Sequence, residues 1–346
     1  MKRLIPLGVT ALVLFSVFLS AVYAEDQLKL YTENRILQVK VTKTTPDTIF
    51  YERSGMPQTA KVGDVESLTY EGEPSQFKSA RQSMAEGRNE DARTVLTSIK
   101  GENIARKEVA AEHAFLLAQA NARIAFQGGD TSPKNAIAGL DAFLKKYTDS
   151  YRRYEALQLQ GDLNLEIKET KKALEAFTEL SKVKDSPMTQ ARGCLGRAKV
   201  LLSAGKNGVA EAEAMYKAVQ SLIDRQELKA DVPAIQMNVS LGVARCAAIN
   251  GKHAEAQAKV QQVIKQLAPE DGATNALAYN TLGDALSQEG KPKDAIVAYL
   301  HTHLLYSSDP SLHADALTKL AALFRAEGNH GRAQELEDVR MKQYGK

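Results

Sequence analysis

The chain contains no tryptophan, and aromatic residues make up only 6% of its 346 residues. A core with so few large rings has to be built from small and aliphatic side chains, as in closely stacked helices. There are also only two cysteines, Cys194 and Cys246, which are too few for the disulfide framework of a small secreted domain. An exported protein could pair them. The interpretation we favour is that both are buried apolar residues on neighbouring helices.

An excess of charge of one sign is missing as well. The formal net charge is +3, which is too small to indicate nucleic acid or an anionic membrane as the partner. The pair His301-x-His303 does not predict a metal site, because positions two apart on a helix point about 200° apart. Residues 127–134 (QGGDTSPK) lack the Gly-Lys-Ser/Thr ending of a phosphate-binding loop. We therefore expect no catalytic residues, no cofactor and no metal.

The N-terminus has the parts of a secretory signal peptide. Met1-Lys2-Arg3 is basic, the next residues are apolar up to Leu19, and Val22-x-Ala24 precedes two acidic residues. Cleavage after Ala24 would export the chain to the periplasm or cell envelope and reduce the formal charge to +1, because Lys2 and Arg3 leave. The alternative is an uncleaved anchor, and only then do we expect membrane association.

Residues 33–74 predict a small β-rich module. The segment 36–43 (ILQVKVTK) alternates apolar and polar residues, and 48–53 (TIFYER) is β-branched and aromatic. We expect two further short strands, around Val62 and around Leu68, with a turn at 54–58 (SGMPQ). Such a module could cap the structure that follows, or the edges of its sheet could pair with a strand of a partner.

Residues 76–346 repeat one spacing. A small residue is followed seven positions later by Gly and twelve positions later by Ala. The Gly ends one helix in the left-handed conformation, and the two small residues let a pair of antiparallel helices approach closely. The copies are Ala80/Gly87/Ala92, Gly161/Lys168/Ala173, Ala198/Gly205/Ala210, Ala244/Gly251/Ala256, Gly283/Gly290/Ala295 and Ala321/Gly328/Ala333.

The step from Ala80 to Gly161 is about twice the others, which predicts a hidden unit. Its helices are expected at 109–126 and 133–147, with a stretched loop between them. The sequence therefore predicts a mostly α fold of about seven antiparallel helix pairs, an α-solenoid, preceded by the small β-rich module.

The unit Leu282-Gly283, Gly290, Ala295, Tyr299 resembles the tetratricopeptide-repeat (TPR) family, and residues 143–177 resemble exported TPR proteins of bacterial cell envelopes in particular. The resemblance covers about residues 76–346, although the steps of 37–46 residues exceed the 34-residue period of the family. It implies a right-handed superhelix whose concave groove is lined by the first helix of each pair and usually holds a peptide or a helix of a partner.

Residues three before, one after and five after each small residue should project from the first helices into that groove. From these positions we predict the partner-binding residues Arg81, Gln158, Asp162, Lys199, Arg245, Asn280, Asp284 and Gln288. Charges of both signs and amides suit an extended peptide.

The leading hypothesis is a non-enzymatic scaffold that binds a protein or peptide partner at the cell envelope. The alternatives are a structural component of an envelope assembly and an accessory subunit of a cell-wall or secretion enzyme.

Overall fold

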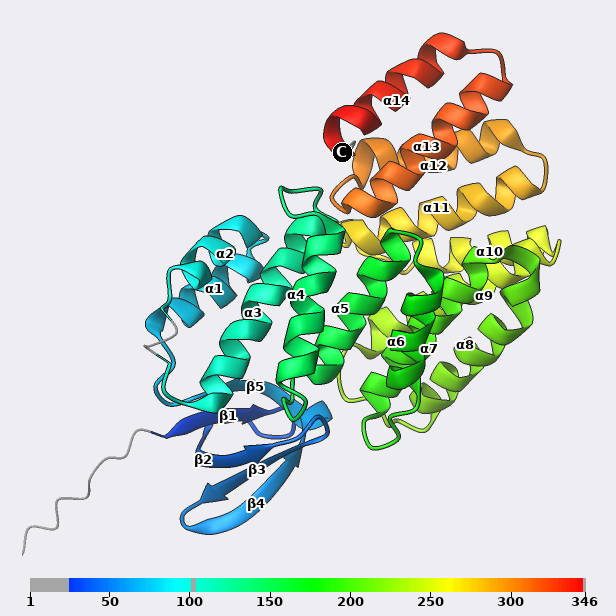
Figure 1. Cartoon of the computed structure of the whole chain (residues 1–346). Coiled ribbons are helices and arrows are strands. Elements are labelled where there is room, and N and C mark those ends of the chain that lie inside the picture. The colour runs from blue at the N-terminus through cyan, green and yellow to red at the C-terminus, as the bar shows by residue number, and fades with distance from the viewer. Residues whose placement is uncertain (1–24, 101–103, 345–346) are drawn as a thin grey trace, which may run out of the picture.

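The computed structural model describes residues 25–100 and 104–344, so the expected signal peptide, residues 1–24, lies outside the described residues. Five strands come first, followed by fourteen α-helices in the described part of the chain (Figure 1). The strands are β1 (Asp26–Leu30), β2 (Leu37–Thr44), β3 (Thr48–Arg53), β4 (Met56–Lys61) and β5 (Val65–Thr69).

The helices form seven consecutive antiparallel pairs, as the sequence predicts. They are α1 (Ser75–Ala85) and α2 (Asn89–Thr97), α3 (Lys107–Phe126) and α4 (Pro133–Lys146), α5 (Arg153–Glu166) and α6 (Thr170–Ser181), α7 (Pro187–Ser203) and α8 (Val209–Asp224), α9 (Val232–Ile249) and α10 (His253–Ile264), α11 (Gly272–Gln288) and α12 (Pro292–Leu305), and α13 (Pro310–Ala326) and α14 (His330–Tyr344). The hidden unit is α3 and α4. We call the odd-numbered helices the first helices.

The turn between the two helices of a pair explains the repeated Gly. The glycine of each copy has φ between 66° and 82°, which is the left-handed conformation that Gly adopts without a Cβ penalty. These residues are Gly87, Gly205, Gly251, Gly290 and Gly328. In the copy without Gly, Lys168 adopts the same conformation, with φ of 63°. The repeated Gly therefore marks a position that needs a positive φ. A non-Gly residue can also adopt this conformation, with a penalty in conformational energy.

The small residues of the template allow the close approach of the helices. Gly283 lies against the Tyr299 ring, and an added Cβ would come within 2.6 Å of that ring. Gly161 has the same relation to Phe177, where the distance would be 2.8 Å. Ala295 is fully buried. In these two pairs the first helix therefore packs against a ring from its own second helix.

One copy of the template has the wrong register. Ala210 is exposed, whereas Ala212 is fully buried and Tyr216 lies four residues after it, as Tyr299 lies four after Ala295. A short 3₁₀ segment, Gly205–Gly208, precedes α8 and adds residues to the turn. The buried position therefore moves two residues along the chain.

The sheet has one more strand than expected and is antiparallel throughout, with the order β4-β3-β2-β1-β5. Strand β1 begins at Asp26, ahead of the expected module. The strand expected around Val62 is wrong, because Val62–Asp64 forms a 3₁₀ turn. The turn that joins β3 to β4 contains only Ser54 and Gly55, both with positive φ, so Met56 and Pro57 begin β4. A Pro is tolerated there because β4 is an edge strand.

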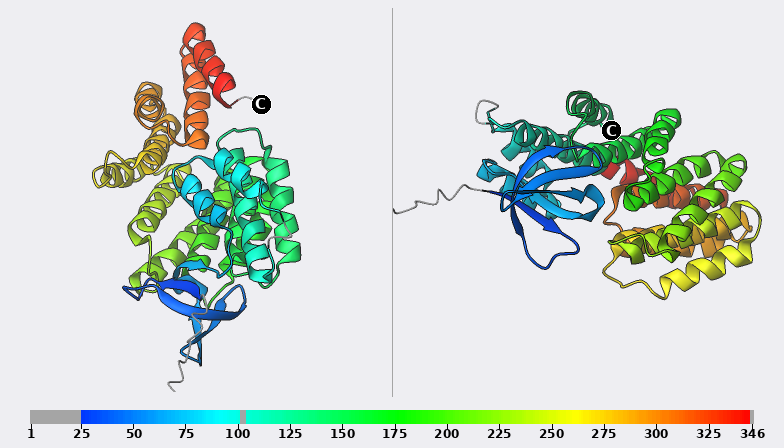
Figure 2. Two further views of the ribbon diagram at one scale, coloured as in Figure 1. Left: turned by 90° about the vertical axis from the view of Figure 1, so that its left-hand side faces the viewer. Right: turned by 90° about the horizontal axis from the view of Figure 1, so that it is seen from below.

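The sheet packs on the edge of the array where the first helices begin (Figure 1, Figure 2). Arg106, just before α3, makes two ion-paired hydrogen bonds to buried Asp26 at 2.6 and 3.1 Å. The Tyr154 hydroxyl of α5 donates to Asp47 at 3.0 Å. Lys229, just before α9, pairs with Asp64 at 2.6 Å. The sheet therefore braces several helix pairs at once, and we call β1–β5 the head.

Helix α9 is the one described helix that is long and apolar enough to cross a membrane. It packs between α8, α10 and α11, and 44% of its apolar stretch is buried, as for a core helix of the array. Cys246 on α9 and Cys194 on α7 are both buried and free.

Candidate functional site

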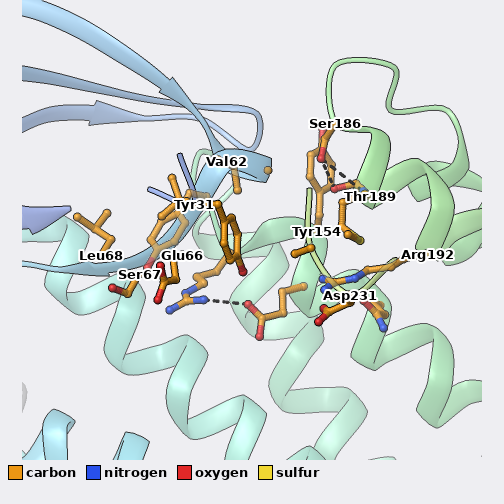
Figure 3. Close-up of a pocket in the computed structure, with 18 of the residues that line it drawn as sticks. Tyr31, Val62, Glu66, Ser67, Leu68, Tyr154, Ser186, Thr189, Arg192 and Asp231 are labelled. Atoms are coloured by element: carbon orange, nitrogen blue, oxygen red, sulfur yellow. Dashed lines mark hydrogen bonds and ion pairs between the residues drawn. The ribbon is translucent and has the colours of Figure 1, made fainter. Parts of the chain in front are cut away.

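Among the cavities of residues 25–100 and 104–344, three lie along the first helices. The largest, which we call the head-side cavity, has a volume of about 440 Å³ and lies between the head and helices α5 and α7 (Figure 3). On the head it is lined by Tyr31 and by all of β5. Tyr154, Thr189 and Arg192 line it from the helices.

The second, which we call the cationic cavity, has a volume of about 230 Å³ and lies between α5, α7 and α9. Its polar lining includes Arg192, Lys199 and Arg245, together with Asp162. Gln158 and Arg192 line both this cavity and the head-side cavity. The two are therefore parts of one groove.

The third, the C-terminal cavity, has a volume of about 290 Å³ and lies at α11 and α13. Asp284 faces it but is already paired, at 2.6 Å to Lys319 and at 2.7 Å to the Tyr299 hydroxyl. Gln288 is the exposed amide of this cavity.

A network of buried charges lies beneath the head-side cavity. The Glu112 carboxylate of α3 is fully buried and accepts hydrogen bonds from Arg81, Arg152 and the Tyr151 hydroxyl at 2.9–3.1 Å. Burial opposes ionisation of Glu112, but the two guanidinium groups outweigh it and hold its pKa below the ordinary value. Arg81 also pairs with Glu73 at 2.6 Å. These cations are therefore occupied within the protein.

The cations of the cationic cavity are in the opposite situation. Arg192 and Lys199 are exposed and Arg245 is half-buried, and in the part of the chain that the structure describes none of them makes an ion pair of 4 Å or less. Burial raises the pKa of Asp162, and Lys199 opposes that shift. The cavity thus gathers three cations that no carboxylate of the described residues neutralises by contact.

Comparison with known proteins finds structures of similar fold but no similar sequence among protein families or curated proteins. No protein-family model matches the sequence, and no curated protein matches it. Among solved structures, a tetratricopeptide repeat protein from Parabacteroides merdae has a TM-score of 0.55 at 14% identity, over 78% of this chain and 91% of that one. The fold is TPR-like. The Rap protein complexed with Competence and Sporulation Factor is also similar, with a TM-score of 0.56 at 14% identity, over 78% of this chain and 75% of that one.

Seven of the eight predicted residues line a cavity of the TPR-like array. Arg81 and Gln158 line the head-side cavity, Gln158, Asp162, Lys199 and Arg245 line the cationic cavity, and Asp284 and Gln288 line the C-terminal cavity. Asn280 does not line any of the three. It is 3% exposed, its amide donates to the Leu312 carbonyl at 2.9 Å, and it accepts from the Thr302 hydroxyl at 2.8 Å. Asn280 therefore joins α11 to α12 and α13.

Sequence reasoning missed two groups of lining residues. Arg192 and Asn238 lie seven residues before Lys199 and Arg245, two helical turns back on the same face, so extending the template by two turns would have found them. The second group is β5 and Tyr31. No helical spacing could have indicated that the head borders the groove.

His301 and His303 contact different residues. No group of three or more His, Cys, Asp or Glu suited to a metal occurs in residues 25–100 and 104–344. His301 stacks on Tyr279 at 4.3 Å, whereas His303 makes a 2.8 Å hydrogen bond to His313, so the two residues face different neighbours, as expected. His313 is buried, with 3% of its surface exposed.

Proposed function

We propose that the protein is a non-enzymatic scaffold that binds an extended, acidic segment of a partner protein in the groove. One observation carries the proposal. Arg192, Lys199 and Arg245 line one cavity from successive first helices, with no ion pair to a described carboxylate. Cations that no internal carboxylate contacts are available to a ligand, and acidic peptides are recognised by such clusters.

The shape of the groove supports a chain-like ligand. The head-side and cationic cavities share Gln158 and Arg192, so a ligand can pass from one to the other. Their volumes, about 440 and 230 Å³, suit a short run of residues rather than a folded domain. The Rap protein, whose fold is similar, has been solved in complex with Competence and Sporulation Factor, which agrees with ligand binding by this architecture.

We further propose that the protein acts outside the cytoplasm, in the periplasm or cell envelope. The basic start, apolar run and Val-x-Ala sequence at residues 1–24 support export. N-terminal sequencing of the secreted form tests this proposal, and its first residue should be Glu25. A first residue of Met1 in the membrane fraction would instead indicate an anchor.

A binding measurement tests the role of the cationic cavity. The probe is the synthetic peptide Thr-Val-Thr-Val-Thr-Val-Glu-Glu-Glu with a fluorescent label, titrated with the protein at low salt. The double variant Lys199→Glu, Arg245→Glu should weaken binding by about tenfold or more, because each reversal replaces attraction with repulsion. The matched control is Lys171→Glu, Lys217→Glu, which changes the net charge equally at two second-helix residues that are not in the lining of any of the three cavities.

The control should bind the peptide within about twofold of the unaltered protein. If both double variants weaken binding equally, only the overall charge matters and the cationic cavity is not the site. Unaltered binding by the Lys199→Glu, Arg245→Glu variant would also refute the proposal.

A second candidate function, a structural component of an envelope assembly, is favoured by one other surface. Val297, Leu304 and Leu305 on α12 are 55%, 65% and 65% exposed, and apolar patches of this kind mark association surfaces. Sedimentation of the protein from residue 25 onward tests this candidate. Concentration-dependent oligomers that Leu304→Glu abolishes would support it, and a monomer at high concentration would exclude it.

A further inference from the structure

Strand β5 borders the head-side cavity with its edge. It is the last strand in the order β4-β3-β2-β1-β5 and pairs only with β1. All five of its residues, Val65 to Thr69, line the cavity. Successive side chains of a strand point to opposite faces, so an unbroken run of lining residues means that the backbone edge meets the cavity. Figure 3 shows this strand across the cavity from Tyr154 and Arg192.

The two edges of the sheet differ in how they are protected. The edge strand β4 carries Pro57 and ends in Lys61, and both residue types discourage pairing with another chain. Strand β5 has neither Pro nor Lys, and its Glu66, Ser67 and Thr69 are exposed. The unprotected edge is therefore the one inside the groove.

The N-terminal end of β5 lies beside the helix that connects the two cavities. An added Cβ on Gly63, two residues before β5, would lie 3.2 Å from the Ser186 hydroxyl just before α7. Arg192, one of the residues common to both cavities, lies on this same helix. A chain that leaves the β5 edge at this end thus meets the cations of the cationic cavity next.

We propose that the partner segment binds as an added strand on the free edge of β5, with its acidic flank in the cationic cavity. This inference rests on the function proposed above and specifies how the ligand is held. Backbone hydrogen bonds to β5 supply affinity that does not depend on sequence, and Arg192, Lys199 and Arg245 select the acidic flank. The occupant is an extended peptide segment rather than a second copy of this chain, because the three cations complement acidic residues, and β5 itself carries Glu66.

A backbone-modified probe tests the strand pairing. The same nonapeptide is made in two forms, with N-methyl groups either on its three valines or on its second and third threonines, because the amides of alternate residues point to opposite edges of a strand and only one set can face β5. Both forms keep every side chain, and the affinity of one of them should fall at least tenfold. In a parallel measurement, the unmodified peptide should slow hydrogen exchange of the amides in residues 65–69, since new interstrand hydrogen bonds protect them.

The two proposals fail in different ways. If both methylated peptides bind as tightly as the unmodified one, or exchange in residues 65–69 is unchanged, strand addition is refuted. The acidic-ligand proposal then still stands if the Lys199→Glu, Arg245→Glu variant loses binding. If residues 65–69 are already protected in a dimer without peptide, the occupant is a second copy and the inference is wrong. If the unmodified peptide does not bind at millimolar concentration, both proposals fail.

Discussion

The two connected cavities of the groove contain similar side chains in different electrostatic states. Beneath the head-side cavity, Arg81 and Arg152 pair with the buried Glu112. In the cationic cavity, Lys199 and Arg245 pair with no described carboxylate, and Asp162 is the only acid in the lining. The difference teaches that a charged residue facing a groove indicates a ligand only when the protein has not already neutralised it. Arg81 and Lys199 occupy equivalent template positions, but Arg81 is paired with carboxylates of the protein and Lys199 makes no ion pair with a described carboxylate.

The sharpest test of this comparison is Glu112→Gln. Two guanidinium groups would then lack their shared carboxylate, and breaking a buried pair costs about 3 kcal/mol of unfolding free energy. Urea unfolding measures the loss. The matched change, Arg192→Gln, removes a cation that lines both cavities and makes no ion pair with a described carboxylate. It should alter stability by less than about 0.5 kcal/mol. Equal losses from the two variants would abolish the distinction.

A smaller effect separates buried from exposed copies of the repeat template. Ala295→Leu should overpack the α11–α12 pair and cost about 2 kcal/mol, because Ala295 is fully buried. Ala210→Leu occupies the same template position in another copy, but Ala210 is exposed and its replacement should be nearly neutral. Thermal unfolding of both variants checks the register. A destabilised Ala210→Leu would mean that α8 is rotated from the position described.

The smallest expected effect is the pH dependence of stability from two hydrogen-bonded histidines, His303 and His313. His303 Nδ1 lies 2.8 Å from His313 Nε2, and His313 Nδ1 lies 2.7 Å from the Tyr344 hydroxyl. Burial lowers the pKa of both histidines; Arg332 adds to the shift of His303, and His303 to that of His313. One hydrogen bond between two rings has room for one proton, so protonation of both rings is disfavoured.

Since the folded-state pKa values lie below about 6.5, the unfolded chain takes up protons first as the pH falls. Stability should therefore be full above pH 7 and decrease as the pH falls below about 6.5, before most carboxylates titrate. Urea unfolding across this range measures the slope. His303→Asn keeps a hydrogen-bonding group near the Nδ1 position without the titration and should flatten the slope. An unchanged slope would assign the acid sensitivity to other groups.

The array could be predicted from the sequence because each repeat needs the same residue types at the same local positions. The left-handed turn at Gly290 and the ring of Tyr299 against Gly283 involve residues close together in the chain, so periodicity reveals them. The error at Ala210 has a local cause too, the extra 3₁₀ residues before α8. Seven of the eight predicted site residues line cavities because their positions follow from helix geometry alone.

What could not be predicted depends on contacts between distant residues. Asn280 fits the template, but whether its amide meets solvent or the Leu312 carbonyl depends on how α13 stacks. The same holds for Arg81, whose two partners Glu73 and Glu112 come from different elements. Strand β1 was missed because Asp26, a polar residue at its start, is buried through partners far along the chain: Arg106 and the backbone amides of Val41 and Glu71. Spacing in the sequence carries no information of this kind.

The contacts of the head also set an order for folding. Each helix pair can form from neighbouring residues soon after synthesis, but Tyr154 meets Asp47 across 107 positions and Lys229 meets Asp64 across 165. Contacts between residues far apart in the sequence form slowly. The head is synthesised before the helices, but its contacts with them form last. Until α9 exists, β5 is an open strand edge without the groove around it. During synthesis there is thus an interval in which this edge is open to pairing with other chains, a cause of aggregation.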